Sequence, residues 1–351
     1  MFFADKTFLR PLLPMADAIL GYFADRMDHE YNLVVSKTTE PGVWHFHDWT
    51  NEWRPYGIPP AVVRTGISTY SNSLYSYTLQ LASHLQKFCY GRAEVATEYL
   101  ERSRRVADAI RKHCFDGEFF TDSLASGSDP RVDRSQHSQV WAVLCGATEN
   151  KALSRDLLRR SLTTTQSSTA AASADSLPPL IQTSVAMSFY SLRALSKVGG
   201  ILYEEVFHGF WKPWHAQLAL GLSTWEEDTV SHRSDCHAWG SAPIYEFMAE
   251  VVGFRPAQPG WTDITFAPRI SLYSELTATV PFRTGPDRKL CLASVSWKPT
   301  ASGGTRVSLS ISGLQRGSPV RVVIPSLPVR IVEDPERIGF TISDKAVRPA
   351  S

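Results

Sequence analysis

Residues 255–261 read RPAQPGW, and the spacing of apolar residues changes on either side of this stretch. Before it, apolar residues recur at intervals of three and four, the period of an amphipathic helix, as in Phe8, Leu12, Met15, Ile19 and Phe23. After it, apolar residues alternate with polar ones, the period of a strand, as in Val307, Leu309 and Ile311. The sequence therefore predicts a helical domain over residues 1–258 and a β domain over residues 259–351.

The helical domain contains about eight runs with helical spacing. They lie near residues 8–23, 74–88, 92–114, 135–146, 151–162, 178–198, 201–217 and 237–252. Residues 163–179 are small and polar and end in two prolines, which indicates a loop. Successive pairs of helices without a fixed repeat favour a partial (α/α)6 helical-hairpin toroid over a solenoid, followed by an antiparallel β-sandwich.

The charge balance bears on the class of partner. The chain has 351 residues, with 36 Lys and Arg against 35 Asp and Glu, and a formal net charge of +1. A balanced chain has no overall field that attracts nucleic acid or an acidic membrane surface, so neither is predicted as a partner. A small molecule or a glycoside is the predicted substrate.

The amino terminus and the cysteines predict a cytoplasmic protein. The opening MFFADKTFLR reaches Asp5 after only a few apolar residues, unlike the apolar core of a signal peptide. No run approaches the roughly 18 apolar residues that a membrane span needs. The five cysteines are odd in number and widely spaced, which favours reduced thiols over a disulfide framework.

Several cofactor and nucleophile motifs are missing from the sequence. It contains no glycine-rich phosphate loop, no dinucleotide fingerprint, no G-x-S-x-G elbow and no C-x-x-C pair. No cofactor is therefore predicted, and carboxylate and aromatic chemistry remains.

The first candidate site is WHFHDWTNEW, residues 44–53, which surrounds Asp48 and Glu52 with rings. The rings belong to Trp44, His45, His47, Trp49 and Trp53. Carboxylates accept hydrogen bonds from sugar hydroxyls, and indole faces cover the apolar C–H surface of a sugar. The alternative is a loop whose tryptophans pack in the core and whose charges face water.

The second candidate site is STWEEDTVSHRSDCHAWGSAP, residues 223–243. Trp225 could desolvate Glu226 on one side and raise the pKa of its carboxyl, and Glu226 or Glu227 could serve as one of the two carboxylates of glycoside hydrolysis. His237 and Trp239 complete the aromatic surroundings. The alternative is an exposed acidic pair before a helix that Ser234 or Asp235 caps.

A metal site in the same stretch would use His232, Asp235, Cys236 and His237. Adjacent positions seldom converge on one ion, and none of the usual zinc spacings occurs. No metal is predicted. A nucleophilic role for Cys236 is equally disfavoured, because on a helix the neighbouring His237 would point elsewhere.

Two longer stretches resemble glycoside hydrolase family 78, the α-L-rhamnosidases. WKPWHAQLALGLSTWEED and SDCHAWGSAPIYEFMAEVVGFRPAQPGWTDITFAPR are similar to the end of that family's catalytic toroid and the start of its carboxy-terminal β-sandwich. DWTNEWRPYGIPPAVVRTGISTYSNSLYSYTLQLASHL and DRSQHSQVWAVLCG are similar to earlier hairpins. The resemblance extends over most of residues 1 to about 300.

The resemblance implies a ring of helical hairpins and hydrolysis that inverts the anomeric centre. It implies that Glu226, in the T-x-W-E segment, is the catalytic base and that His237, in the HAW segment, lines the sugar pocket. The family's general acid lies in a motif similar to C-P-Q-R-D-E-R-x-x-W-x-G-D, which this sequence lacks. The expected molecule is therefore a toroid shortened at its amino terminus.

Two function classes follow as expectations. The first is an α-L-rhamnosidase-like hydrolase with Glu226 as base and Asp48 or Glu52 as acid. Its expected sugar pocket consists of Trp44, Trp49, Trp53, Trp225, His237 and Trp239. The second is a shortened toroid that serves secondary metabolism as a cyclase or isomerase on a largely apolar metabolite, or as a binding protein. An inactive fragment is a third alternative.

A homodimer or another protein partner is also expected. An unclosed ring of hairpins exposes apolar helix faces, and a second copy or a partner would cover them.

Overall fold

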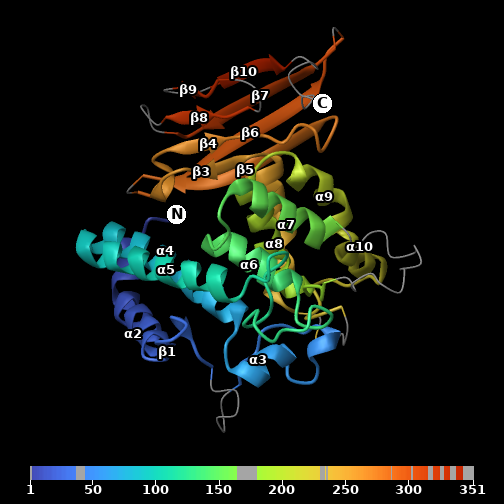
Figure 1. Cartoon of the computed structure of the whole chain (residues 1–351). Helices are drawn as coiled ribbons and strands as arrows, with labels where there is room; N and C mark the ends of the chain where they lie inside the picture. Colours follow the sequence, from blue (N-terminus) through green and yellow to red (C-terminus); the bar gives the residue numbers. More distant parts are fainter. Residues whose placement is uncertain are drawn as a thin grey trace. The chain divides into compact units, whose positions relative to one another are not determined.

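The computed structural model describes residues 2–36, 44–163, 180–229, 234, 236–285, 287–301, 303–314, 319–324, 328–332 and 337–342. Its contacts divide the chain into a helical unit, residues 6–240, and a β unit, residues 1–5 with 241–351. A helical region thus precedes a region of β-strands, which confirms the predicted fold class (Figure 1). The predicted boundary at residue 258 stays a prediction; residues 241–258 belong to the β unit in this division.

The helical unit consists of successive helices joined by loops. The helices are α1 (Lys6–Leu9), η1 (Arg10–Leu12), α2 (Leu13–Ala24), η2 (Asn51–Trp53), α3 (Pro60–Thr65), α4 (Thr69–Tyr90), α5 (Ala93–His113), α6 (Gln136–Cys145), α7 (Lys151–Thr163), η4 (Val185–Met187), α8 (Ser188–Val198), α9 (Leu202–Phe210), α10 (Lys212–Ala219) and η5 (Ala238–Ser241). A short hairpin of β1 (Met27–Asp28) and β2 (Leu33–Val34) follows α2. No helix in the described part of the chain is long and apolar enough to cross a bilayer.

Helices α4 and α5 form the longest hairpin of this unit (Figure 1). The Ser68 hydroxyl accepts a hydrogen bond from the backbone amide of Ser71 and so caps the start of α4. Gly91 ends α4 with φ of 69°, a left-handed conformation that glycine adopts without strain. Between the helices, the hydroxyls of Ser76 and Ser103 lie 2.9 Å apart. Small side chains at this contact let the two helices approach closely.

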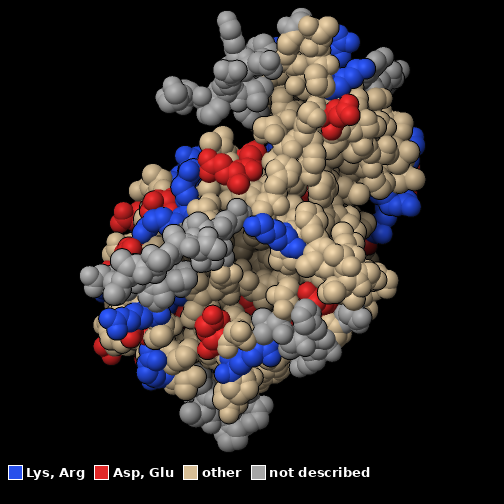
Figure 2. Space-filling model, turned by 90° about the vertical axis from the view of Figure 1, so that its right-hand side faces the viewer, with Lys and Arg blue, Asp and Glu red and all other residues tan. Residues whose placement is uncertain are grey.

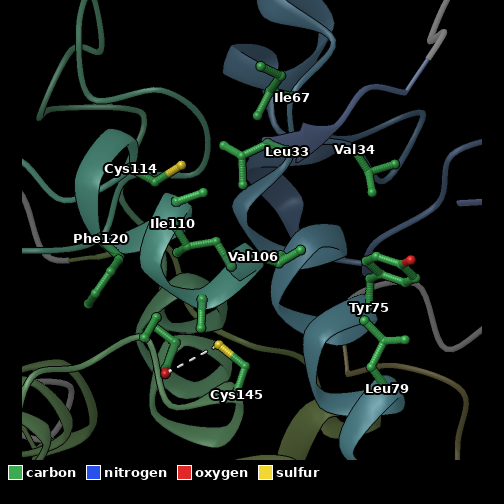
Figure 3. Packing of buried hydrophobic residues seen from close by; sticks show 14 of the residues in the cluster. Leu33, Val34, Ile67, Tyr75, Leu79, Val106, Ile110, Cys114, Phe120 and Cys145 are labelled. Atoms are coloured by element: carbon green, nitrogen blue, oxygen red, sulfur yellow. Dashed lines mark hydrogen bonds between the residues drawn. The ribbon is translucent and has the colours of Figure 1, made fainter. Parts of the chain in front are cut away.

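Helix α6 crosses the interior of the unit, and all ten of its residues are buried. Its N-cap Ser135 accepts the amide of Ser138, and Gly146 ends it in the left-handed conformation. The core beside it contains Leu33, Tyr75, Leu79, Val106, Ile110 and Phe120 (Figure 3). The thiol of Cys145 donates to the carbonyl of Ala142 in the same cluster. Helix α6 therefore positions any polar side chain it carries rigidly.

Three predicted helices differ from the structure. Residues 201–217 form two helices, α9 and α10, because Pro213 favours the first turn of a new helix. The run near 178–198 becomes helical only at η4, after the extended Ser184. The run near 237–252 consists of η5, the short α11 (Ala242–Glu246) and the π-helical turn η6 (Phe247–Val251). Apart from Thr163, the predicted loop at 163–179 lies outside the described residues.

The described residues of the β unit form two four-stranded sheets. One has the order β10-β7-β6-β5 and the other β3-β4-β8-β9. The strands are β3 (Phe254–Pro256), β4 (Ile264–Phe266), β5 (Leu276–Thr284), β6 (Lys289–Pro299), β7 (Thr305–Ser312), β8 (Val320–Val322), β9 (Arg330–Val332) and β10 (Arg337–Ile342). Val307, Leu309 and Ile311 are buried on β7, as their alternation predicts.

One strand pair departs from the predicted antiparallel arrangement. Strand β4 pairs in parallel with β8, with Ile264 opposite Val320. After β4, the chain forms β5, β6 and β7 in the other sheet, and β8 then pairs with β4. Alternation within a strand identifies its buried face but not its neighbour, so this pair could not be predicted.

Candidate active site

The two candidate stretches, residues 44–53 and 223–243, meet in the helical unit. The indole Nε1 of Trp49 donates a hydrogen bond to Oε1 of Glu227 at 3.1 Å. The guanidinium of Arg54 lies 3.2 Å from Oδ1 of Asp228. These contacts join segments 178 and 174 residues apart in the sequence. The predicted aromatic loop and the predicted acidic segment therefore belong to one site.

Three consecutive carboxylates of the acidic segment are buried. Glu226 and Glu227 are each 3% exposed and Asp228 is 1% exposed. The amide of Glu226 donates to Oε1 of Gln217 at 3.0 Å, and the amide of Glu227 donates to the carbonyl of Ser234 at 2.6 Å. The alternative of an exposed acidic pair is therefore wrong. Removing carboxylates from water costs free energy, and three of them are buried in this one segment. Such burial is typical of a functional site.

His237 and Trp239 cover Glu227 from the same segment. Their rings lie 4.4 Å apart between centroids, and Nε2 of His237 is 3.9 Å from Oε1 of Glu227. The Trp239 indole donates to the carbonyl of Glu227 at 2.9 Å. The His237 amide donates to the carbonyl of Trp225, so backbone bonds fix these rings relative to the carboxylates.

Trp225 packs against the backbone of Gly240. A Cβ at Gly240 would lie 2.3 Å from Cβ of Trp225, far inside a normal contact. Only glycine allows this approach, which helps to hold Trp225 beside Glu226.

Asp48 is fully buried and accepts four hydrogen bonds. They come from Nε2 of His137 at 2.6 Å, from the amide and hydroxyl of Ser184 at 2.8 and 2.5 Å, and from the amide of Trp49 at 2.8 Å. Burial alone would raise the pKa of Asp48, but the bonds from His137 and Ser184 hold it below its ordinary value. A carboxylate so enclosed and so acidic is suited to holding three segments together rather than to giving a proton to a substrate.

The remaining predicted residues of the first stretch divide between interior and surface. Trp53 is buried, and its ring packs on His137 with centroids 4.5 Å apart. Trp44 is 60% exposed, and its indole donates to the carbonyl of Tyr56. Glu52 is exposed and accepts a hydrogen bond from the Thr50 hydroxyl at 3.0 Å. Of the two predicted acids, only Glu52 faces solvent.

A cavity of about 630 Å³ lies beside Trp49. It is lined by Trp49, Thr50, Asn51, Glu52, Pro60, Arg131, Val132, Leu180, Ile181, Gln182, Thr183, Ser184 and Thr229. Its volume is in the range of small-molecule sites. Glu52 lines it, whereas Glu226 is not among the described residues that do so.

Sequence reasoning missed the residues that hold this site in place. His137, Ser184 and Arg54 bind Asp48 or Asp228 from distant parts of the chain. The only local signal for His137 was its place in the polar first turn of a helix whose later residues are mostly apolar. Nothing in the sequence near Ser184 indicates its partner.

The described residues contain no group of three or more His, Cys, Asp or Glu side chains placed to hold a metal ion. Two residues of the rejected metal reading, His232 and Asp235, lie outside the described part of the chain.

A second buried carboxylate supports the start of α6, which carries His137. Asp122 accepts hydrogen bonds from the hydroxyls of Ser135 and Ser138 at 2.5 and 2.7 Å. Burial raises the pKa of Asp122 to about 6, against the opposing effect of these bonds. Burial also lowers the pKa of His47, whose ring contacts Ser68, to about 4.

These two groups predict opposite dependences of stability on pH. Between pH 3.8 and about 6, Asp122 keeps a proton in the folded chain that it loses on unfolding, so the free energy of unfolding falls as pH rises. His47 gains a proton on unfolding between pH 4 and 6.5, so its contribution to that free energy rises with pH. The two effects partly cancel in the wild type.

Replacing Asp122 with Asn should expose the contribution of His47. Between pH 4.5 and 6, we expect the free energy of unfolding of Asp122→Asn to rise with pH more steeply than that of the wild type, by up to about 1.4 kcal/mol per pH unit. The melting temperature should follow the same trend. Thermal melts at several pH values test this. Parallel curves for the two proteins would contradict it.

Charges of both signs are mixed on one face of the molecule. On the face shown in Figure 2, Lys and Arg side chains lie among Asp and Glu side chains. That face has no broad region of one sign.

Comparison with known proteins identifies structural neighbours only. No protein-family model matches the chain, and no curated protein sequence matches it. Among solved structures, the family 78 rhamnosidase of Bacillus sp. GL1 is 21% identical, with a TM-score of 0.70 over 92% of this chain and 31% of that chain. The α-L-rhamnosidase of Aspergillus terreus is 15% identical, with a TM-score of 0.67 over 97% of this chain and 37% of that one.

The α-L-rhamnosidase of Streptomyces avermitilis, solved with L-rhamnose, is 16% identical, with a TM-score of 0.61 over 97% of this chain and 30% of that one. The chain thus spans about a third of the length of these structures. At this identity the likeness shows the fold alone, and it confirms the resemblance stated from the sequence at that level.

Proposed function

We propose that the chain, which shares part of the fold of the α-L-rhamnosidases, is a glycoside hydrolase that acts on a small rhamnoside with inversion. The observation that carries the proposal is the hydrogen bond from Trp49 to Glu227. It joins an aromatic loop to a segment of buried carboxylates, the combination that sugar binding and glycoside hydrolysis need.

Glu226 is the proposed base. It follows Trp225, is buried, and has its backbone fixed by Gln217. In an inverting reaction, Glu226 takes a proton from a water molecule while the water oxygen bonds to the anomeric carbon. Glu227 is turned toward Trp49 and orients the site.

Glu52 is the proposed acid. Asp48 already accepts four hydrogen bonds in the interior, whereas Glu52 is exposed and lines the cavity. Glu52 gives its proton to the glycosidic oxygen as the bond from that oxygen to the anomeric carbon breaks. The products are the free sugar and the aglycone as a neutral alcohol, with Glu226 protonated and Glu52 ionised until they exchange a proton through water.

The exposed rings supply the proposed sugar contacts. Trp44 and Trp239 are the exposed indoles of the two stretches, and their faces suit the apolar side of a deoxy sugar. Trp49 contacts both the Trp44 ring and the Glu227 carboxylate, and His237 packs on the Trp239 ring beside that carboxylate. Trp53 has a structural role instead, because its ring is covered by His137.

Release of nitrophenol from 4-nitrophenyl α-L-rhamnoside by the purified chain tests the proposal. We expect hydrolysis with an optimum between two pH limits, set by one carboxylate that must be ionised and one that must be protonated. If the folded chain hydrolysed no rhamnoside at any pH, the proposal that it is a rhamnoside hydrolase would be wrong.

Glu52→Gln tests the acid separately. A general acid assists poor leaving groups most, so we expect kcat to fall about 100-fold or more on an alkyl rhamnoside and much less on a dinitrophenyl rhamnoside. Glu101→Gln, an exposed change on α5, is the matched control. An equal loss on both substrates would show that Glu52 is not the acid.

The burial of Asp48 also favours a second function class. Of the two candidate acids, Asp48 and Glu52, only Glu52 remains, and the sequence lacks the acid motif of family 78. A non-hydrolytic enzyme or a binding protein would use the same cavity for a largely apolar small molecule. Quenching of tryptophan fluorescence by such a ligand, without hydrolysis of any rhamnoside, would identify this class.

We also propose that the protein works in a reducing compartment such as the cytoplasm. All five cysteines are free thiols, and four of them are buried singly. Disulfides are rare in such compartments.

A further inference from the structure

The first helical segment exposes a row of large apolar side chains on its outer face. Residues 6–24 are helical throughout, as α1, η1 and α2 in succession. Along this segment the exposed side chains repeat at intervals of four and three, with exposed fractions between 40% and 67%: Phe8, Leu12, Met15, Ile19 and Tyr22. This is the spacing of a helix seam that packs against another helix.

The opposite face of the same helices already packs against the helical unit. Leu13 and Leu20 are buried there. Asp17 accepts hydrogen bonds from Gln86 at 2.9 Å and from the Tyr99 hydroxyl at 2.6 Å. A helix that is apolar on both faces is normally buried on both faces. The exposed seam therefore needs a cover.

We propose that a second copy of this chain covers the seam, with the two helices antiparallel about a twofold axis at Met15. The intervals are nearly symmetric about Met15, so Phe8 meets Tyr22 of the partner subunit and Leu12 meets Ile19 of the partner subunit. Met15 meets its own copy. The small Ala16 and Ala18 flank the centre and allow close approach.

The charges of Lys6 and Asp25 favour this orientation. Lys6 lies at the start of the segment, with its ammonium 4.6 Å from the centre of the Phe88 ring, and Asp25 lies directly after the end of the segment; both are exposed. The guanidinium of Arg26 lies 3.5 Å from the centre of the Tyr22 ring. In an antiparallel pair each Lys6 lies near Asp25 of the partner subunit, and the twofold axis makes this contact twice. A parallel pair would place like charges together at both ends.

The area of the seam is sufficient for a specific dimer. With about 200 Å² for a fully exposed large side chain, the five residues present about 500 Å² on one copy and about 1,000 Å² on two. This reaches the lower limit of specific protein interfaces, about 1,000 Å² in total. The dimer is proposed independently of the function of the site.

Sedimentation equilibrium of the full chain and of Ile19→Glu tests the seam. We expect the wild type to dimerise at micromolar concentrations and Ile19→Glu to raise the dissociation constant at least about 100-fold, because two carboxylates then face each other in an apolar contact. Ile201→Glu is the matched control, since Ile201 is 48% exposed at the start of α9 and Ile19 is 50% exposed. It should dimerise like the wild type.

A wild type that stays monomeric, or an Ile19→Glu variant that still dimerises, would overturn the proposal. If Ile19→Glu and Ile201→Glu were both monomeric, the assignment of the dimer interface to this seam would be overturned. A monomeric wild type would instead favour a different chain as the cover.

Charge reversal tests the orientation with variants that leave the apolar seam intact. Lys6→Glu and Asp25→Lys should each weaken the dimer about tenfold at low ionic strength, and the double variant should restore it. A double variant weaker than either single one would overturn the antiparallel arrangement.

Discussion

Glu226→Gln should abolish turnover of an aryl α-L-rhamnoside, with kcat at least about 1,000-fold below the wild type. The amide has the shape of the carboxylate but cannot take a proton from water. Glu226 is buried and held through its backbone, so the change should leave the fold in place. Initial rates together with a thermal melt of each protein measure the effect.

Glu227→Gln separates the two neighbouring carboxylates. Its Oε1 already accepts the Trp49 indole, and an amide oxygen can accept the same bond. We expect a smaller loss, about tenfold, through weaker positioning. If Glu227→Gln were inactive and Glu226→Gln active, the base would be Glu227.

Asp48→Ala should give the largest loss of stability. The change leaves the His137 ring and the Ser184 amide and hydroxyl without their acceptor in the interior. Removing one partner of a buried, charged hydrogen-bond network costs about 3–5 kcal/mol. We therefore expect the melting temperature to fall by about 10 °C or more.

Glu52→Gln in the same stretch provides the control for Asp48→Ala. Glu52 is exposed, so its replacement should change the melting temperature by about 1 °C or less. A small effect of Asp48→Ala would show that other contacts hold the aromatic loop against α6. Asp48 would then lose its assignment as a positioning residue.

The order of helices followed by strands could be predicted from the sequence, because the spacing of apolar residues is a local property of each segment. The spacing of Phe8, Leu12 and Met15 predicted helix, the alternation of Val307, Leu309 and Ile311 predicted strand, and both are observed. The break between α9 and α10 follows from Pro213, a local signal that the sequence already contains. The parallel pairing of β4 with β8 depends on neighbours that are distant in the sequence, so the pattern within each strand could not predict it.

The membership of the site was also partly predictable. The aromatic loop and the acidic segment were identified from their composition, and the bond from Trp49 to Glu227 joins them. Burial separated residues that looked alike in the sequence. Asp48 and Glu52 are four positions apart, yet one is enclosed by His137 and Ser184 and the other faces solvent. Such a difference arises from packing between residues far apart in the chain.

The parallel pairing of β4 with β8 has a consequence for the order of folding. Strands β5, β6 and β7 are linked by short hairpins, whereas β8 reaches β4 only after the chain has passed through all three. Closing that long loop costs more entropy than closing a hairpin, and the cost falls while the intervening strands are already compact. The three-stranded meander should form first, and β8 and β9 should complete the second sheet afterwards.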